Sequence, residues 1–232
     1  MILQEKLLVM ALSCVSMLVS AQDPESPPIQ FRTVLQDPMN PSANLFFRDS
    51  AGAIVQIEIR PKALSLPMVT KTVNGSLVLF NKATIDPEKP DANMAAICKI
   101  PVGAKRGIVI ILPSPADTKP AYRMVFIDDS AKAFPKGESR ILTLMPMELA
   151  IEAGEHKLPI HPGEIARLPP VKKVDEFNMA QTNFYFKKGD SWTVITQRQF
   201  QYLDRIRRIF IIHASSGAAH PTVNSITDNT AL

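Results

Sequence analysis

The stretch Pro101-Val-Gly-Ala-Lys-Arg-Gly-Ile-Val-Ile-Ile-Leu112 decides the fold class of this chain. Its proline fixes φ and Gly103 allows a positive φ, so the first residues are expected to form a tight turn. The apolar run from Ile108 to Leu112 is too short for a helix, and Pro113 ends it. A turn that leads directly into a short apolar strand is typical of β-proteins.

The same device returns twice before residue 170. Pro135-Lys-Gly-Glu-Ser-Arg140 precedes the apolar run Ile141-Leu-Thr-Leu144, and Pro162-Gly-Glu-Ile-Ala-Arg167 repeats the turn. Elsewhere Asn74-Gly75 separates two apolar segments, which is the strongest short-range hairpin signal. The same residues spell a glycosylation sequon with Ser76, but the turn accounts for them without a sugar.

About a dozen short strands are expected, with turn signals every 8–12 residues and no alternation of strands with helices. Twenty prolines and few long apolar periodicities agree with this. The sequence therefore predicts an all-β protein, an antiparallel immunoglobulin-like β-sandwich built as one large sandwich or two tandem ones.

Residues 1–21 have the pattern of a signal peptide. Charged Glu5 and Lys6 precede an apolar run, and Val19-Ser-Ala21 suits signal peptidase. The run is shorter than the ~20 residues of a membrane span, and no stop-transfer charges follow it. A membrane anchor and a lipoprotein cleaved at Cys14 are the weaker alternatives. We expect cleavage and export to the periplasm or the extracellular space.

The mature chain is expected to divide at the proline-rich segment 113–120. This gives an N-terminal β region over 22–112, a C-terminal β-sandwich region over 121–213, and a flexible tail over 214–232. Once the signal peptide is removed, Cys98 is the only cysteine. A domain of this size needs no disulfide, so Cys98 is expected to act as a small buried hydrophobe.

The formal net charge is +4, and the densest basic group is Arg198, Arg205, Arg207 and Arg208. Lysine pairs occur at 172–173 and 187–188. An exported protein of this charge would meet anionic envelope polymers, so an envelope protein or an anionic polymer is the expected partner. Ordinary solubilising charge is the simpler interpretation. Export argues against nucleic acid, and only the signal peptide is expected to meet the membrane.

No group of residues reaches the level of a catalytic, cofactor or metal site. Glu155, His156, His161 and Glu164 are the best metal candidates, but the odd spacing puts the two histidines on opposite faces of a strand, and prolines interrupt it. The loop Gly103-Ala-Lys-Arg-Gly107 lacks the spacing of a phosphate-binding loop. We expect no metal and no cofactor.

Carboxylates offer the only basis for an enzyme. Asp128-Asp129-Ser130 follows a predicted strand and is typical of a turn, without the further oxygen ligands that calcium requires. Glu148 and Glu152 lie four residues apart on one face, where paired carboxylates could serve a glycosidase. Leu149 and Ile151 alternate with them, so a solvated strand face is the better interpretation.

One hairpin gathers aromatic residues. Phe184 and Phe186 share a face and are expected in the core, whereas Tyr185 and Trp192 are candidates for a surface that stacks on a sugar or peptide. Five motifs follow one another along the chain: Pro101 to Arg106, Phe126-Ile-Asp-Asp-Ser-x-Lys-Ala-Phe-Pro-x-Gly137, the turn Pro162-Gly-Glu164, the Lys187-to-Trp192 hairpin and Ser225-Ile-Thr-Asp228. In this series the chain resembles uncharacterised exported β-rich proteins of environmental bacteria. The resemblance implies export and a β fold, and no activity.

Two functions follow as expectations. The first is a non-enzymatic exported β-sandwich protein of the bacterial envelope that binds a protein or polymer partner. A periplasmic chaperone with two immunoglobulin-like domains is a specific variant, although the motif strands of that family are missing. The alternative is a secreted, carbohydrate-active hydrolase that uses surface carboxylates among Asp128, Asp129, Glu148 and Glu152.

Overall fold

The computed structural model describes residues 27–36, 43–60, 62–85, 89–115, 117–214 and 220–229. Within them the chain forms sixteen strands in four four-stranded sheets, and one short 3-10 helix, Pro90–Asn93. The prediction of an all-β protein is confirmed. The predicted signal peptide lies outside the described residues.

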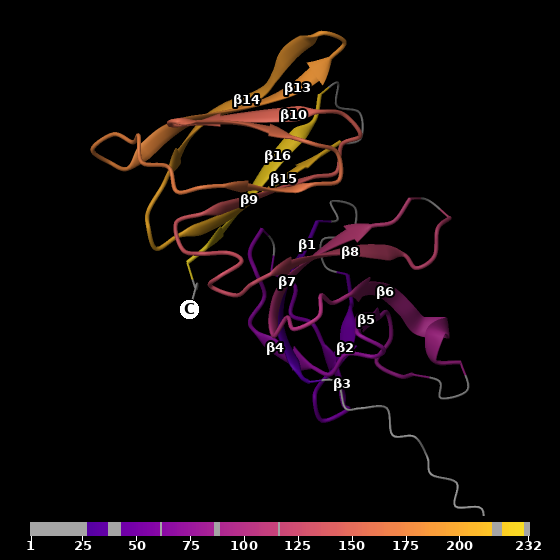
Figure 1. Cartoon of the computed structure of the whole chain (residues 1–232). Coiled ribbons are helices and arrows are strands. Elements are labelled where there is room, and N and C mark those ends of the chain that lie inside the picture. The colour runs from indigo at the N-terminus through magenta and orange to yellow at the C-terminus, as the bar shows by residue number, and fades with distance from the viewer. Residues whose placement is uncertain are drawn as a thin grey trace, which may run out of the picture.

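The first eight strands form two sheets, with the strand orders β4-β1-β7-β8 and β3-β2-β5-β6 (Figure 1). We call these the A sheet and the B sheet. Their strands are β1 Ile29–Leu35, β2 Phe46–Arg48, β3 Ile54–Gln56, β4 Met68–Thr70, β5 Ser76–Phe80, β6 Met94–Lys99, β7 Arg106–Pro113 and β8 Tyr122–Asp128.

The next eight strands repeat this arrangement. They form the C sheet, β12-β9-β15-β16, and the D sheet, β11-β10-β13-β14, so every strand has the neighbours of the strand eight places earlier. The chain therefore builds one eight-stranded unit twice. The strands are β9 Ser139–Thr143, β10 Leu149–Ala153, β11 His156–Ile160, β12 Ile165–Leu168, β13 Met179–Lys188, β14 Ser191–Gln201, β15 Arg207–His213 and β16 Thr222–Asp228.

Two of the sheets are mixed, so the expectation of purely antiparallel sheets is wrong for them. In the A sheet β1 runs parallel to β7, and in the C sheet β9 runs parallel to β15. These parallel pairs lie at the centre of their sheets, where both faces are buried. Continuous apolar runs such as Ile108 to Leu112 and Ile209 to Ile212 are what such strands require.

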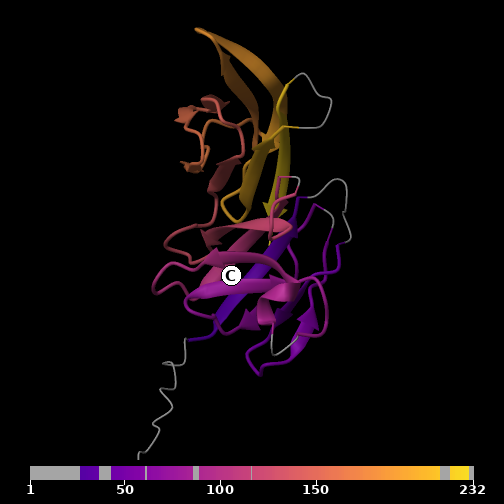
Figure 2. The ribbon, with the colours of Figure 1, turned by 90° about the vertical axis from the view of Figure 1, so that its right-hand side faces the viewer.

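The four sheets stack as layers in the order B, A, C, D (Figures 1 and 2). One hydrophobic core lies between B and A, and another between C and D. A third core joins A to C, where Ile108 and Ile110 of β7 meet Ile209 and Ile211 of β15. The two units are thus held together by an apolar interface between their inner sheets.

The turns at Gly75, Gly103, Gly137 and Gly163 form where the sequence places them, but they connect strands of different sheets. Asn74 and Gly75 both have positive φ, at 49° and 67°, as a tight two-residue turn requires. Only Val73 and Ser76 bridge across it, because β4 continues into the A sheet and β5 into the B sheet. The turn is confirmed, whereas the extended hairpin predicted there is wrong.

The proline-rich segment 113–120, where the chain is expected to divide, connects two neighbouring strands of the A sheet. It joins β7 to β8, which pair from Gly107–Asp128 to Pro113–Tyr122. The chain passes from the first pair of sheets to the second only between Asp128 and Ser139. The predicted tail 214–232 includes β16, which pairs with β15 from Arg207–Asp228 to His213–Thr222, so it is not loose over that strand.

Candidate functional site

The two candidate aspartates at the end of β8 have different surroundings. Asp128 accepts a hydrogen bond from the backbone N–H of Ser130 at 2.8 Å, as expected of a turn residue. Asp129 is only 4% exposed and faces the interface between the two inner sheets. Neither arrangement leaves a carboxylate facing an open substrate site.

Asp129 belongs to a group that we call the buried ion cluster: Arg32, Asp129, Arg207 and Asp228. Arg32 donates to both carboxylates, at 3.0 Å to Asp129 and 2.8 Å to Asp228. Arg207 also bridges them, with 2.5 Å to each. All four residues are buried, and the half-buried Arg106 adds a third guanidinium 3.7 Å from Asp129. A buried group of this kind ties the two units together.

The two aspartates of the buried ion cluster occupy matching places in the two repeated units. Asp129 continues β8 opposite Arg106, and Asp228 stands opposite Arg207 at the end of β16, so the two aspartates occupy equivalent positions in the two units. Burial by itself would raise the pKa of the Asp228 carboxyl, but hydrogen bonds from Arg32 and Arg207 outweigh it and hold that pKa well below its usual range.

Half of the basic group near the C-terminus is not at the surface: Arg198 and Arg205 are exposed, whereas the interpretation of Arg207 and Arg208 as surface charges is wrong. Both are buried, at 3% and 7% exposure. The Arg208 guanidinium lies over the rings of Phe200 and Tyr202, at 5.1 and 5.4 Å from their centroids. Arginine tolerates this position because its planar cation is weakly hydrated and interacts with aromatic faces.

Glu148 and Glu152 lie far from the aspartates, on the opposite side of the C sheet. Glu152 lies in β10 of the D sheet and Glu148 immediately precedes that strand. The core between C and D separates both from Asp129 by at least about 10 Å, the usual spacing of stacked sheets. Four residues of extended chain place Glu148 and Glu152 roughly 13 Å apart. Glycosidase carboxylates stand about 5–9.5 Å apart. Glu148 and Glu152 are therefore too far apart to form such a pair, and neither lies near the two aspartates.

The metal candidates fall into two separate pairs, Glu155 with His156, whose Nε2 lies 3.3 Å from Glu155 Oε1, and Glu164 with His161. His156 begins β11 and His161 follows its last residue, roughly 16 Å away along an extended strand. Glu155 accepts hydrogen bonds from the backbone N–H groups of Lys172 and Lys173, at 2.8 Å each. Glu164 accepts one from the N–H of His161. In the described part of the chain no group of three or more possible ligands could hold a metal ion.

Two smaller expectations concern single residues. Cys98 is half-buried rather than fully buried, and its side chain packs against the core between the A and B sheets, in agreement with a hydrophobic role. Burial raises the pKa of its thiol to about 11. Gly107, at the end of the glycine-rich basic loop, lies against the ring of Phe126, which leaves no space for a side chain. The requirement for glycine there comes from packing.

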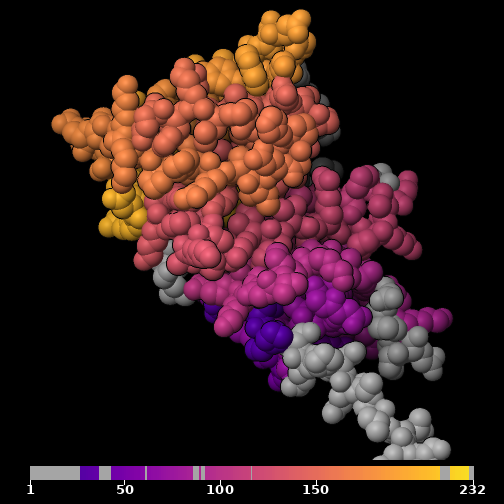
Figure 3. All heavy atoms as spheres, in the orientation of Figure 1, coloured from indigo at the N-terminus to yellow at the C-terminus, as the bar shows by residue number. Residues whose placement is uncertain are grey.

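The aromatic hairpin divides as predicted. Phe184 and Phe186 of β13 are buried in the core between the C and D sheets. Tyr185 points to the other side, which we call the outer face: the side of the D sheet turned away from that core. Trp192 and Val194 of β14 pair with Lys187 and Tyr185 and share this face. Trp192 is 49% exposed. The D sheet forms the upper end of the molecule in Figure 3.

Charges on the outer face compensate one another. Lys187 pairs with Glu148 at 3.0 Å, and Lys157 with Glu152 at 2.8 Å. Tyr185 donates its hydroxyl hydrogen to Glu152 at 2.8 Å. Hydrogen bonds, from Lys187 to Glu148 and from Lys157 and Tyr185 to Glu152, lower the pKa of both carboxyls. A general acid needs a raised pKa, so these glutamates are poorly suited to that role.

The outer face also carries a set of amides that sequence reasoning missed. They lie on one side of two paired strands, in the register Gln181–Gln199 and Asn183–Gln197, with Gln201 opposite Met179. The sequence pattern that could have revealed them is glutamine at every second residue in Gln197-Arg-Gln-Phe-Gln201. In a strand such a pattern places all three amides on one face.

No helix among the described residues has the length and apolar character needed to cross a membrane. No protein-family model matches the chain, and no curated protein matches it.

Proposed function

We propose that this chain is a non-enzymatic exported protein of the bacterial envelope, periplasmic or extracellular, built on an immunoglobulin-like β-sandwich. It binds a protein or polymer partner through the outer face of the D sheet. The observation that carries this proposal is the pair Tyr185 and Trp192, which lie on a solvent-facing sheet away from the core. Aromatic rings with one polar edge are favoured at binding surfaces.

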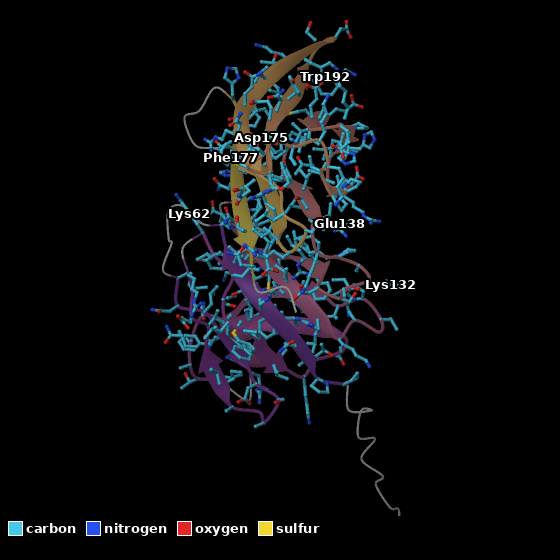
Figure 4. The ribbon with its side chains drawn as sticks, turned by 90° about the vertical axis from the view of Figure 1, so that its left-hand side faces the viewer. Lys62, Lys132, Glu138, Asp175, Phe177 and Trp192 are labelled. Carbon is cyan, nitrogen blue, oxygen red and sulfur yellow. The ribbon has the colours of Figure 1, made fainter. Side chains whose placement is uncertain are left out.

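The surroundings of the two aromatic residues support a recognition role. The Tyr185 hydroxyl is held by Glu152, which fixes the orientation of the ring. Trp192 stands near the end of the long β13–β14 hairpin, at the upper end of the ribbon in Figure 4. It pairs with Lys187, one residue beyond the last β13 residue that pairs with β10. A fixed aromatic residue loses little side-chain entropy on binding, which favours affinity.

Binding is better supported than the hydrolase alternative because the candidate carboxylates already have structural partners. Asp129 lies in the buried ion cluster, and Asp128 holds a turn. Glu148 and Glu152 are paired with lysines and are kept ionised by them. None of these four residues is left to protonate a leaving group.

The proposal is tested by capture from the envelope. The mature chain, Gln22 to Leu232, is immobilised and exposed to solubilised envelope of its own host, before and after protease treatment. We expect the wild type to retain a defined component and a Tyr185→Ala/Trp192→Ala variant to lose it. Leu66→Ala is the matched control, since Leu66 is exposed in the first unit. Equal retention by wild type and the double variant would overturn the proposal.

A further inference from the structure

We infer that the outer face binds a neutral, hydroxyl-rich polymer, an extended glycan, laid along β14. This inference rests on the proposed function and names the partner class of the same surface. Three features carry it: a set of exposed amides, aromatic residues at both ends of β14, and compensated charge.

The amides supply the hydrogen-bonding chemistry that sugars require. Gln197, Gln199 and Gln201 are all exposed and lie on the same side of β14. Each primary amide offers two donors and one acceptor, which matches hydroxyl groups that both donate and accept. On β13 the Gln181 amide donates to Asn183 at 2.9 Å. The register Gln181–Gln199 and Asn183–Gln197 places these amides beside those of β14, so the set covers two neighbouring strands.

Aromatic residues stand at both ends of this strand. Trp192 lies at the hairpin end, with Tyr185 beside it on β13. At the other end, Gln201 donates to the backbone carbonyl of Phe177, whose side chain is 66% exposed. From Trp192 to Gln201 the strand covers roughly 30 Å. A platform of this length fits several units of an extended chain, and aromatic rings stack on the apolar faces of sugars.

The charge of the outer face selects against an anionic partner. Its four charged side chains form two internal pairs, Lys187 with Glu148 and Lys157 with Glu152. An anionic polymer would meet a carboxylate beside each lysine, so the face offers no net attraction. This moves the expected partner from the anionic polymer indicated by net charge to a neutral one.

The backbone of β14 disfavours an added peptide strand. β14 is the outermost strand of its sheet, and a shift in register between Phe184 and Tyr185 places a β-bulge opposite them. A bulge interrupts the regular ladder that an added strand would extend, and proteins use bulges to protect edges. A ligand that binds the face through side chains does not need that ladder.

The test is native affinity electrophoresis of the mature chain. Gels contain a neutral soluble polysaccharide (xyloglucan, galactomannan or hydroxyethylcellulose) or an anionic one (polygalacturonate or alginate). We expect retardation by at least one neutral polymer, unchanged from low to high salt. Trp192→Ala should weaken binding about tenfold or more, and Gln197→Ala/Gln199→Ala about fivefold or more. Asn81→Ala, an exposed amide in the first unit, should bind as wild type.

The other outcomes are decisive. Retardation by anionic polymers alone, abolished by salt, overturns the inference and leaves the proposed function standing. The same holds if no polysaccharide binds while envelope capture yields a Trp192-dependent protein. Neutral binding that survives all the outer-face variants overturns both. Since the substituted side chains are exposed, urea unfolding of each variant should match wild type, which separates lost binding from lost folding.

Discussion

Replacing Asp228 by asparagine should strongly destabilise the protein. The carboxylate accepts hydrogen bonds from both nitrogens of Arg32 that face it, each at 2.8 Å, and from two nitrogens of Arg207, at 2.5 and 3.2 Å. The amide preserves the shape but removes one of two negative charges, so two buried guanidinium groups would share Asp129 alone. One amide N–H would also point at a cation.

The magnitude follows from the burial of the group. Removing one partner from a buried ion pair costs about 3–5 kcal/mol, because the remaining charge is left without water or compensation. For a chain of this size that corresponds to a fall in melting temperature of about 6–20 °C. Loss of a surface charge, by contrast, usually changes stability by less than about 0.5 kcal/mol.

Urea unfolding of Asp228→Asn and wild type, followed by tryptophan fluorescence and by circular dichroism, measures the difference. Asp190→Asn, an exposed change at the tip of the β13–β14 hairpin, is the matched control and should leave the midpoint in place. A loss below about 1 kcal/mol for Asp228→Asn would refute the reasoning, since surface pairs account for that much. Different midpoints by the two probes would mean that the two units unfold separately.

Three further outcomes are expected. Arg32 and Arg207 lower the pKa of Asp228 in the folded state. The stabilisation that this carboxylate supplies is therefore complete above its unfolded pKa of about 3.9 and is lost as pH falls below that value. Urea unfolding measured at a series of acid pH values should show this loss of stability, and Asp228→Asn should lack the part that comes from Asp228. Ile110→Ala in the core between the A and C sheets should cost about 2–5 kcal/mol in urea unfolding, whereas Ile97→Ala, 44% exposed, should cost far less; equal losses would contradict the layered packing. Iodoacetamide at mildly alkaline pH should alkylate Cys98 slowly in the native mature chain and rapidly in urea, because burial raises the thiol pKa to about 11; fast native labelling would contradict its burial.

The repeated unit explains why the ion cluster exists. Each unit buries one face of its inner sheet within its own core and must cover the other face against the second unit. Where the strands end, that interface includes charged residues from both units, Arg32 and Asp129 from one and Arg207 and Asp228 from the other. Pairing them offsets the cost of burying each charge alone and favours one relative position of the two units.

The outer face was predictable in part. The hairpin at Lys188-Gly189-Asp190 and the alternation of Phe184, Tyr185 and Phe186 assign Tyr185 to the side opposite the core, as the structure confirms. The amide set was visible only as an alternation of glutamines. The bulge in β14 displaces the alternation by one residue, so sequence spacing does not show that Trp192 and Gln197 share a face.

The sequence by itself determined the fold class, the turns and most strand positions, because these depend on local chemistry. Gly103 and Gly75 mark turns since positive φ costs glycine little, and β7 is apolar from Ile108 to Leu112 since both of its faces are covered there. The tertiary structure alone decided which strands pair. Asn74-Gly75 connects two sheets, and β1 pairs in parallel with a strand over seventy residues away. Arg207, which the sequence suggests to be a surface charge, is buried and ion-paired with Asp129. These outcomes depend on burial of apolar area between distant segments, a quantity that no local pattern contains.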